Sequence, residues 1–330
     1  MEQLDIQKPI TVHQHLLVAK DYLNSRILGQ PDLVNRLLIA LLADGHLMVE
    51  GAPGLAKTRA IKELSRVIDT EFHRIQFTPD LLPGDLTGTD IFRPQDGSFV
   101  FQPGPLFHNL VLADEINRAP AKVQAALLEA MAERQVTIGK KTYPLPPLFL
   151  VMATQNPIEQ EGTYLLPEAQ LDRFLMYLKI GYPDASVEQA ILALARTEAN
   201  GIENKITAFK PLSPALIFQA REAVLNVHLS APLEAYLVKL IIASRKPDTY
   251  SAQLAKWLRY GASPRATIAL DRCAKAHAWL AGRDFVTPED IHSVAYDVLR
   301  HRILLSYEAE AEGITSDDFI SHLLRLIAIP

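Results

Sequence analysis

Apolar and polar positions alternate in two different ways in the first half of the chain. Short, nearly continuous apolar runs indicate strands buried inside a sheet, whereas the longer segments between them carry apolar residues at helical spacing. Strands that alternate with helices predict a parallel sheet, because parallel neighbours must be joined by a crossover connection. We expect the strands at residues 47–50, 72–77, 110–113, 148–154 and 174–180.

The pattern changes after about Tyr182, where strand-like runs end and helix-start signals accumulate. At each signal a hydroxyl side chain stands one or two residues before a proline, as expected for a helix N-cap followed by the first helical turn. These hydroxyl residues are Ser213, Ser230, Ser263 and Thr287. The sequence therefore predicts an α/β domain over residues 1–182, including an N-terminal helical segment, and a small all-helical domain over residues 183–330.

The composition is that of a globular protein, with 330 residues of which 48% are hydrophobic and 22% charged. The formal net charge of −5 provides no broad basic surface, so nucleic acid is not the expected partner. The single cysteine, Cys273, excludes an intrachain disulfide and is expected to be a small buried residue in a helix. We find neither a signal-peptide pattern nor an apolar run near the ~20 residues of a membrane span, so a cytoplasmic protein is expected.

A glycine-rich loop follows the first expected strand and precedes a helical segment. In this context glycines let backbone N–H groups curl around phosphates, and the helix N-terminus adds a positive dipole. Lys57 would reach the β- and γ-phosphates of a nucleotide, and the Thr58 hydroxyl would bind Mg²⁺. An unrelated Gly-Pro turn is the alternative. The loop has the form of a Walker A motif and consists of Gly51, Ala52, Pro53, Gly54, Leu55, Ala56, Lys57 and Thr58.

Ala56 is the one departure from the general Walker A pattern, which has a second glycine at this position. An alanine side chain disfavours the left-handed backbone conformation that glycine adopts freely. We therefore expect a negative φ at Ala56 if the loop is to bind phosphate.

Two acidic residues, Asp114 and Glu115, end the apolar strand expected at 110–113. Such a strand end matches a Walker B motif, in which the first acid holds the Mg²⁺ shell and the second polarises the attacking water. The alternative is that both acids cap the helix that begins near Pro120, but that does not explain the phosphate loop. The two motifs together predict binding and hydrolysis of ATP.

A polar amide, Asn156, follows the apolar strand expected at 148–154. Ligands of parallel sheets bind outside the carboxyl ends of the strands, so this amide is expected beside the Walker acids. Asn156 could hold the attacking water or the γ-phosphate. Alternatively, it is only a turn residue before Pro157.

These motifs resemble those of the MoxR family of AAA+ ATPases, and the similarity spans roughly residues 25 to 300. In that family alanine precedes the Walker A lysine, so Ala56 is itself a family feature. Residues 112–131 resemble the family's Walker B strand and following helix, and residues 153–157 resemble its sensor 1 segment.

Further residues take their expected roles from this resemblance alone. Arg173 lies in a segment that resembles an arginine finger, which implies action on the ATP of a neighbouring subunit. Arg265 lies in a segment that resembles the sensor 2 motif of the lid, and Ile27 and Leu28 in one that borders adenine.

The resemblance implies a P-loop NTPase core of αβα type, with a parallel sheet, followed by a helical AAA+ lid. It also implies a ring, usually a hexamer, and a chaperone-like role in assembling or remodelling other proteins. Partners of the family often carry von Willebrand factor A domains. This chain shows no such domain, so a partner of this kind would be a separate chain.

Two β-hairpins are expected, one within the Pro- and Gly-rich residues 78–106 and one at residues 136–143. Contact with a protein substrate and packing on the chain's own domain are equally open for the first hairpin. A nucleic-acid motor and a nucleotide-gated scaffold with little hydrolysis are the alternative functions. The net charge argues against the motor, and the presence of Glu115, Asn156 and Arg173 argues against the scaffold.

Overall fold

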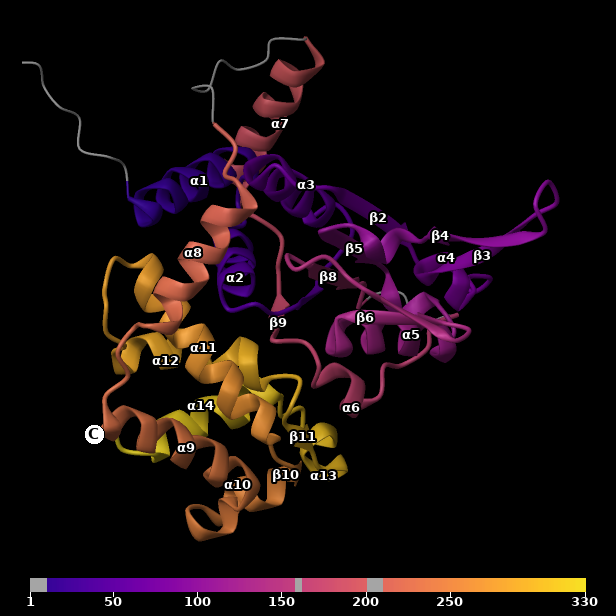
Figure 1. The fold of residues 1–330 in the computed structure, drawn as a ribbon. Coiled ribbons are helices and arrows are strands. Elements are labelled where there is room, and N and C mark those ends of the chain that lie inside the picture. Colours follow the sequence, from indigo (N-terminus) through magenta and orange to yellow (C-terminus); the bar gives the residue numbers. More distant parts are fainter. Residues whose placement is uncertain (1–10, 158–161, 201–209) are drawn as a thin grey trace, which may run out of the picture.

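The structure, a computed structural model, describes residues 11–157, 162–200 and 210–330. A five-stranded parallel sheet in the order β2-β5-β8-β1-β9 forms its first half (Figure 1). All five expected strands are present, and their ends differ from the expected ends by at most two residues. They are β1 (Leu47–Glu50), β2 (Phe72–Gln76), β5 (Leu110–Asp114), β8 (Leu150–Gln155) and β9 (Met176–Lys179).

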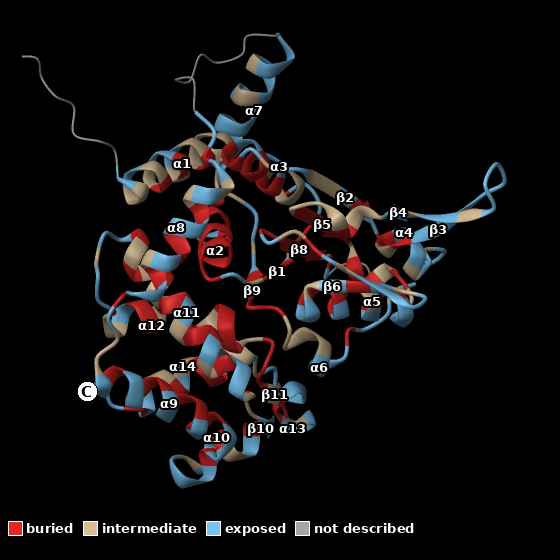
Figure 2. Ribbon diagram, in the orientation of Figure 1, coloured by how far each residue is buried: buried red, intermediate tan, exposed pale blue. Residues whose placement is uncertain are grey.

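Helices cover both faces of the sheet, which confirms the expected αβα arrangement. Successive strand residues point to opposite faces, so in β5 Leu110 and Leu112 join one buried cluster while Val111 and Ala113 join the other. Helices of the first cluster are α1 (Val12–Arg26), α2 (Pro31–Leu42) and α3 (Lys57–Ile68), and those of the second are α4 (Pro83–Thr87) and α5 (Ala121–Glu133). Figure 2 shows both buried layers against the sheet.

The strand register decides which loops meet at one edge of the sheet. Val49 of β1 lies opposite Thr154 of β8, so these two strands end together. Because β9 is parallel to β1 and Met176 lies opposite Leu47, the chain before Met176 lies at the other edge. The glycine-rich loop therefore lies at the edge of the sheet formed by the carboxyl ends of the strands. The segment that contains Arg173 lies at the opposite edge, formed by their amino ends.

The second half is largely helical and begins with the expected caps. Ser213 and Ser263 accept backbone N–H bonds in the first helical turn, Thr287 forms a capping box, and Ser230 occupies a cap position without such a bond. The helices are α7 (Ala185–Ala199), α8 (Pro214–Leu225), α9 (Ala231–Arg245), α10 (Ala252–Trp257), α11 (Pro264–Leu280), α12 (Pro288–Leu299), α13 (Tyr307–Ala311) and α14 (Ser316–Leu326).

The expectation of an all-helical second half is wrong in one detail. Two short strands, β10 (Leu258–Tyr260) and β11 (Leu304–Leu305), pair antiparallel beside α13 and α10. Strands of two or three residues are too short to leave a recognisable two-residue period in the sequence.

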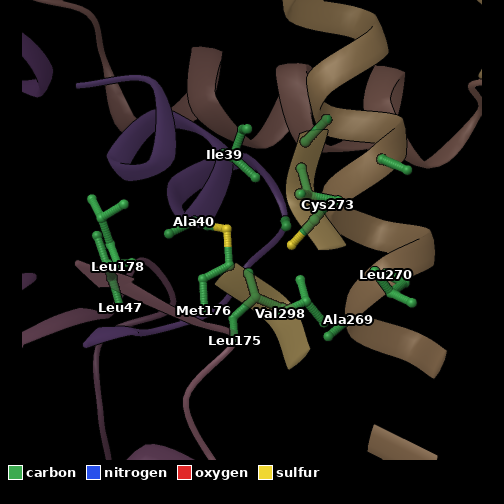
Figure 3. Packing of buried hydrophobic residues seen from close by; sticks show 14 of the residues in the cluster. Ile39, Ala40, Leu47, Leu175, Met176, Leu178, Ala269, Leu270, Cys273 and Val298 are labelled. Carbon is green, nitrogen blue, oxygen red and sulfur yellow. The ribbon is translucent and has the colours of Figure 1, made fainter. Parts of the chain in front are cut away.

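The core is continuous between the sheet and the second-half helices. Figure 3 shows Met176 of β9 among Ala40 of α2, Val298 of α12 and Cys273 of α11. Cys273 is fully buried, as expected, and burial raises the pKa of its thiol to about 12. The division near residue 182 therefore separates two sequence patterns, while one apolar cluster packs across it.

Both expected hairpins are present: β3 (Gly88–Arg93) with β4 (Ser98–Pro103), and β6 (Gln135–Ile138) with β7 (Lys141–Pro144). Phe101 of β4 stacks on Tyr143 of β7, with ring centroids 4.0 Å apart, so the first hairpin is anchored at its base. Its tip projects away from the sheet (Figure 1), where Phe92 and Phe99 are exposed. Packing on its own domain therefore describes only the base of the hairpin.

Short helical turns complete the described chain: η1 (Pro105–Phe107), η2 (Ile116–Arg118), α6 (Glu168–Leu171) and η3 (Pro247–Thr249). Within the described residues, every helix is too short or too polar to cross a membrane.

Candidate functional site

A pocket of about 390 Å³ opens at the edge of the sheet where β1, β5 and β8 end. It brings together residues that are far apart in the chain and that the sequence placed in one site. These are Pro53, Gly54, Leu55, Ala56, Lys57 and Thr58 from the loop, Asp114 and Glu115 after β5, and Asn156 after β8.

The glycine-rich loop joins the end of β1 directly to the first turn of α3. The Gly51 N–H donates to the Gln155 carbonyl at 3.2 Å, which ties the loop to β8. Gly54 has a φ of 85°, a conformation that favours glycine, and a side chain there would face open space. The Lys57 ammonium donates to the Gly51 carbonyl at 2.6 Å, so this lysine lies along the inside of the loop.

Ala56 has a φ of 56°, and the expectation of a negative φ is wrong. A left-handed alanine costs about 1–2 kcal/mol, because its Cβ approaches the carbonyl oxygen. The first helical hydrogen bond of α3, from Ala60 N–H to the Ala56 carbonyl at 2.9 Å, fixes this residue at the helix start. Ala56 also packs against the apolar cluster that includes residues of β1 and α3, and this packing overrides the intrinsic preference from which the expectation was derived.

Asp114 is held by three hydrogen bonds from two neighbouring strands. Its Oδ1 accepts from the Thr154 hydroxyl at 2.6 Å, and its Oδ2 accepts from Arg74 Nε at 3.0 Å and Nη2 at 2.7 Å. Arg74 lies on β2 and also lines the pocket, although sequence reasoning did not identify it. No sequence signal distinguishes it until β2 is known to pair with β5.

Glu115 is oriented by polar side chains on both sides. Its Oε2 accepts from Gln76 Nε2 at 2.8 Å and from Arg118 Nη1 at 3.0 Å, and its N–H donates to the Thr154 hydroxyl at 2.9 Å. The helix after this segment, α5, has Pro120 at its cap position. The helix-capping alternative for the two acids is therefore not what the structure has.

Asn156 is buried to 4% exposure and lines the same pocket. It follows the last residue of β8, at the edge where both Walker acids lie. The structure therefore places this amide beside Asp114 and Glu115, as expected from the order of the strands.

A second cavity of about 260 Å³ adjoins the first, because Gly54 and Ala56 line both. Leu28 and Tyr182 line this second cavity, and contact between Leu28 and the base of a nucleotide stays a prediction. Ile27, in contrast, is 1% exposed and packs into the apolar cluster of α1 and α2. The expectation that Ile27 contacts the base is therefore wrong.

Two loop residues lie behind the pocket surface. Gly51 has its carbonyl turned to Lys57, and the Cβ that any other residue would add there would come within 2.5 Å of the Ile180 side chain. Ala52 is buried. Both shape the loop through the backbone.

Arg173 and Arg265 lie together in a third cavity, of about 310 Å³, at the opposite edge of the sheet. Arg173 Nη1 donates to the Leu128 carbonyl at 2.7 Å, and Arg265 lies 3.6 Å from the Asp172 carboxylate. A local salt bridge, for example with Glu168 or Asp172, is the alternative role for an arginine in this segment. Asp172 is bound instead by Arg302 and Ser263. The structure does not bring Arg173 or Arg265 to the phosphate loop of the same chain.

Two family models match the chain, one over the sheet and one over the second half. Residues 46–176, which hold the loop and both acids, match the ATPase family associated with various cellular activities (AAA). Residues 254–323 match the AAA lid domain. A crystal structure of a Cytophaga hutchinsonii protein assigned as an ATPase superposes with a TM-score of 0.87 at 47% identity, covering 97% of this chain and 96% of that one.

Curated relatives match over most of their own length. Chaperone MoxR1 of Mycobacterium tuberculosis is 45% identical over 308 residues, which is 92% of this chain and 79% of that one. Protein MoxR of Paracoccus denitrificans is 33% identical over 332 residues, covering 92% and 93%. The YeaC protein of Bacillus subtilis is 42% identical over 324 residues, covering 97% and 96%. With this similarity and a phosphate loop that faces two acids, the chain belongs to the MoxR family of AAA+ ATPases.

Proposed function

We propose that this chain binds and hydrolyses ATP with Mg²⁺, assembles into a ring and uses the energy to remodel partner proteins. The observation that supports ATP chemistry best is the single pocket that contains Lys57, Thr58, Asp114, Glu115 and Asn156. An AAA-family fold implies nucleotide binding in general, and this set of residues is what selects a triphosphate with its metal.

The loop and the adjoining cavity fit the two ends of a nucleotide. The loop N–H groups and the start of α3 would receive the phosphates, because a helix N-terminus carries positive dipole charge. Lys57 would leave the Gly51 carbonyl for the β- and γ-phosphates. Leu28 and Tyr182 would enclose the base in the second cavity.

The donor atoms beside the loop also fit Mg²⁺, a hard cation that prefers carboxylate and hydroxyl oxygens. Thr58 and Asp114 would hold it, with Asp114 acting directly or through water. Bound Mg²⁺ offsets the negative charge of the phosphates. Thr154 would keep the Asp114 carboxylate in place through its 2.6 Å hydrogen bond.

In hydrolysis, water attacks the γ-phosphorus, the bond from this phosphorus to the bridging oxygen breaks, and ADP leaves with its negative charge. Glu115 would accept the proton of the water, and Asn156 would position the water or the γ-phosphate. The hydrogen bonds from Gln76 and Arg118 hold the Glu115 carboxylate in place at the pocket. These residues support an active ATPase over a scaffold with little hydrolysis.

Arg173 and Arg265 supply the argument for a ring. Both lie at the edge of the sheet opposite the phosphate loop, so they can reach ATP only on another subunit. A guanidinium at the γ-phosphate stabilises the charge of the transition state. We propose that each interface of the ring, a hexamer by family resemblance, completes one site with these two arginines.

The first hairpin supports contact with a protein substrate. Its tip exposes Ile91, Phe92, Phe99 and Val100, and the rings of Phe92 and Phe99 lie 5.2 Å apart. Apolar groups that project from a folded domain are typical of protein-binding surfaces. One relative is named a chaperone, and a von Willebrand factor A domain on a separate chain is the partner class that we propose.

Phosphate release and particle mass, each measured with and without ATP and Mg²⁺, test hydrolysis and ring assembly. The remodelling role is tested by asking whether the protein, with ATP, suppresses the aggregation of a heat-denatured reporter enzyme. Phe99→Ser should keep phosphate release and lose the suppression, whereas Tyr260→Ser, a control at an exposed aromatic outside the hairpin, should keep both. No phosphate release from assembled wild-type protein would refute the ATPase proposal. Equal suppression by Phe99→Ser would refute the role of the hairpin.

A further inference from the structure

Arg302 lies buried where the chain after α12 meets the segment that carries Arg173. Its side chain is 2% exposed, and all five N–H donors of its guanidinium have acceptors. Nε donates to Asp172 Oδ1 at 2.7 Å, and both Nη atoms donate to main-chain carbonyls. A buried side chain with every donor used has one well-defined position.

Three of the four carbonyls that Arg302 binds lie on the two sides of Arg173, and the fourth is that of Val298 on α12. Nη2 donates to the carbonyl of Asp172 at 3.1 Å and to that of Phe174 at 2.6 Å. Nη1 donates to the carbonyl of Leu175 at 3.2 Å, just before β9. One guanidinium therefore fixes the backbone from which the Arg173 side chain projects.

The ion pair between Asp172 and Arg302 also lies beside Arg265. The Asp172 carboxylate that accepts from Arg302 through Oδ1 accepts through Oδ2 from the Ser263 hydroxyl at 2.8 Å. Arg265 Nη1 lies 3.6 Å from Oδ2. Arg173 and Arg265, which come from different parts of the chain, thus share one anchor formed by Asp172 and Arg302.

The chemistry of the anchor formed by Asp172 and Arg302 indicates that it positions Arg173 and Arg265. Burial lowers the pKa of Arg302, and the hydrogen bond to Asp172 opposes that change. A buried ion pair is often no more stabilising than apolar residues of the same volume. The five hydrogen bonds of Arg302 do, however, fix the geometry of the groups that it binds. Here the arrangement selected is that of the two arginines at the interface edge.

We propose that Arg302 is a positioning residue that holds Arg173 and Arg265 together for action on the neighbouring subunit's ATP. This inference rests on the proposed action of Arg173 in trans. Arg302 contacts no part of the phosphate-loop pocket of its own chain, because it binds the segment at the opposite edge of the sheet.

Arg302→Lys is the direct test, because lysine keeps the charge beside Asp172 and loses the forked donors. ATP affinity should stay near the wild-type value, since the chain's own pocket is intact. ATP hydrolysis should fall by about 10²-fold, the scale of misplacing a reacting group by about 1 Å. Arg283→Lys is the matched control: Arg283 also binds a buried carboxylate, Asp290, through two nitrogens, but away from residues 172–175.

Mixing experiments separate positioning from a general loss of structure. Arg302→Lys mixed with Lys57→Ala should regain ATPase activity, because an intact loop of the first can meet intact arginines of the second. Arg302→Lys mixed with Arg173→Ala should stay inactive, because both lack working arginines at the interface. The reference mixture of Arg173→Ala with Lys57→Ala tests the trans proposal by itself.

If Arg302→Lys does not fold, Asp172→Asn is measured in the same mixtures, since asparagine keeps the volume and removes the charge that Arg302 and Arg265 share. Recovery with Lys57→Ala and none with Arg173→Ala supports the inference for either variant. Wild-type hydrolysis by the folded variant, or no recovery with Lys57→Ala while the reference mixture recovers, overturns it. If the reference mixture itself stays inactive in demonstrably mixed rings, the proposed trans action fails instead.

Discussion

Arg74 and Asp114, on the adjacent strands β2 and β5, form an ion pair inside the phosphate-loop pocket, with Nη2 and Oδ2 2.7 Å apart. Asp114 is the carboxylate proposed to hold Mg²⁺. The arginine would therefore compete with bound Mg²⁺ for this carboxylate.

Arg74→Gln should lower the Mg²⁺ concentration needed for half-maximal Mg–ATP binding. The Arg74 side chain is 48% exposed, and exposed pairs contribute about 0.2–1 kcal/mol, which corresponds to at most about a fivefold shift. Calorimetric ATP titrations at a series of Mg²⁺ concentrations measure it. Weaker ATP binding at every Mg²⁺ concentration would show that Arg74 serves the phosphates instead.

Lys57→Ala should weaken ATP binding at least tenfold, about 1.4 kcal/mol, because the ammonium at the loop would no longer meet the phosphates. Calorimetry with a non-hydrolysable ATP analogue is the measurement. Lys62→Ala is the control, since Lys62 lies on the exposed side of the same helix. Unchanged affinity of Lys57→Ala would contradict the assignment of the phosphate loop.

Glu115→Gln should keep ATP affinity and slow hydrolysis by roughly 10²-fold or more, the scale of acid–base catalysis. The amide keeps the shape of the side chain and loses the charge that takes up the proton. Single-turnover phosphate release measures the chemical step. Glu129→Gln removes an exposed carboxylate from α5 and should change nothing. Normal turnover by Glu115→Gln would assign the base to another residue.

Arg173→Ala should bind ATP normally and hydrolyse it slowly, with a loss in the range of about 10³–10⁵ known for arginine fingers. The residue lies at the edge opposite the loop, so its absence leaves the chain's own pocket unchanged. A mixture with Lys57→Ala should recover part of the activity. Normal hydrolysis by Arg173→Ala alone would rule out its role.

Because His46 is buried, we expect the folded protein to lose stability in weak acid. Its ring is fully buried between the Met131 carbonyl and the Val151 N–H, and burial, with the nearby Arg134, lowers its pKa to about 3. The unfolded chain takes up a proton near pH 6.5 and the folded chain does not, so the stabilisation is present above 6.5 and lost as the pH falls towards 3.

Between pH 7 and pH 5 the free energy of unfolding should therefore fall by roughly 2 kcal/mol from this histidine, at about 1.4 kcal/mol for each pH unit below 6.5. Urea unfolding at a series of pH values measures the change. His46→Gln, although less stable overall, should show a smaller decrease over the same range. An equal decrease in both proteins would assign the acid sensitivity to other groups.

Several parts of the site could be predicted because their signals are local. The apolar run before Gly51, the loop itself and the following helix lie within one stretch of chain, and so do the strand and acids that end at Glu115. Asn156 could be placed because parallel strands present their carboxyl ends at one edge. Arg74 and Gln76 could not, because their roles depend on the pairing of β2 with β5.

The sequence by itself determined the five strands, the phosphate loop, the two acids and the helix caps of the second half, since each follows from residues a few positions apart. Only the tertiary structure decided the positive φ of Ala56, the burial of Ile27 and the anchoring of Arg173 by Arg302. Those outcomes depend on packing and hydrogen bonds between segments far apart in the chain. Local propensity and periodicity contain no information about which distant carbonyl a buried guanidinium will bind.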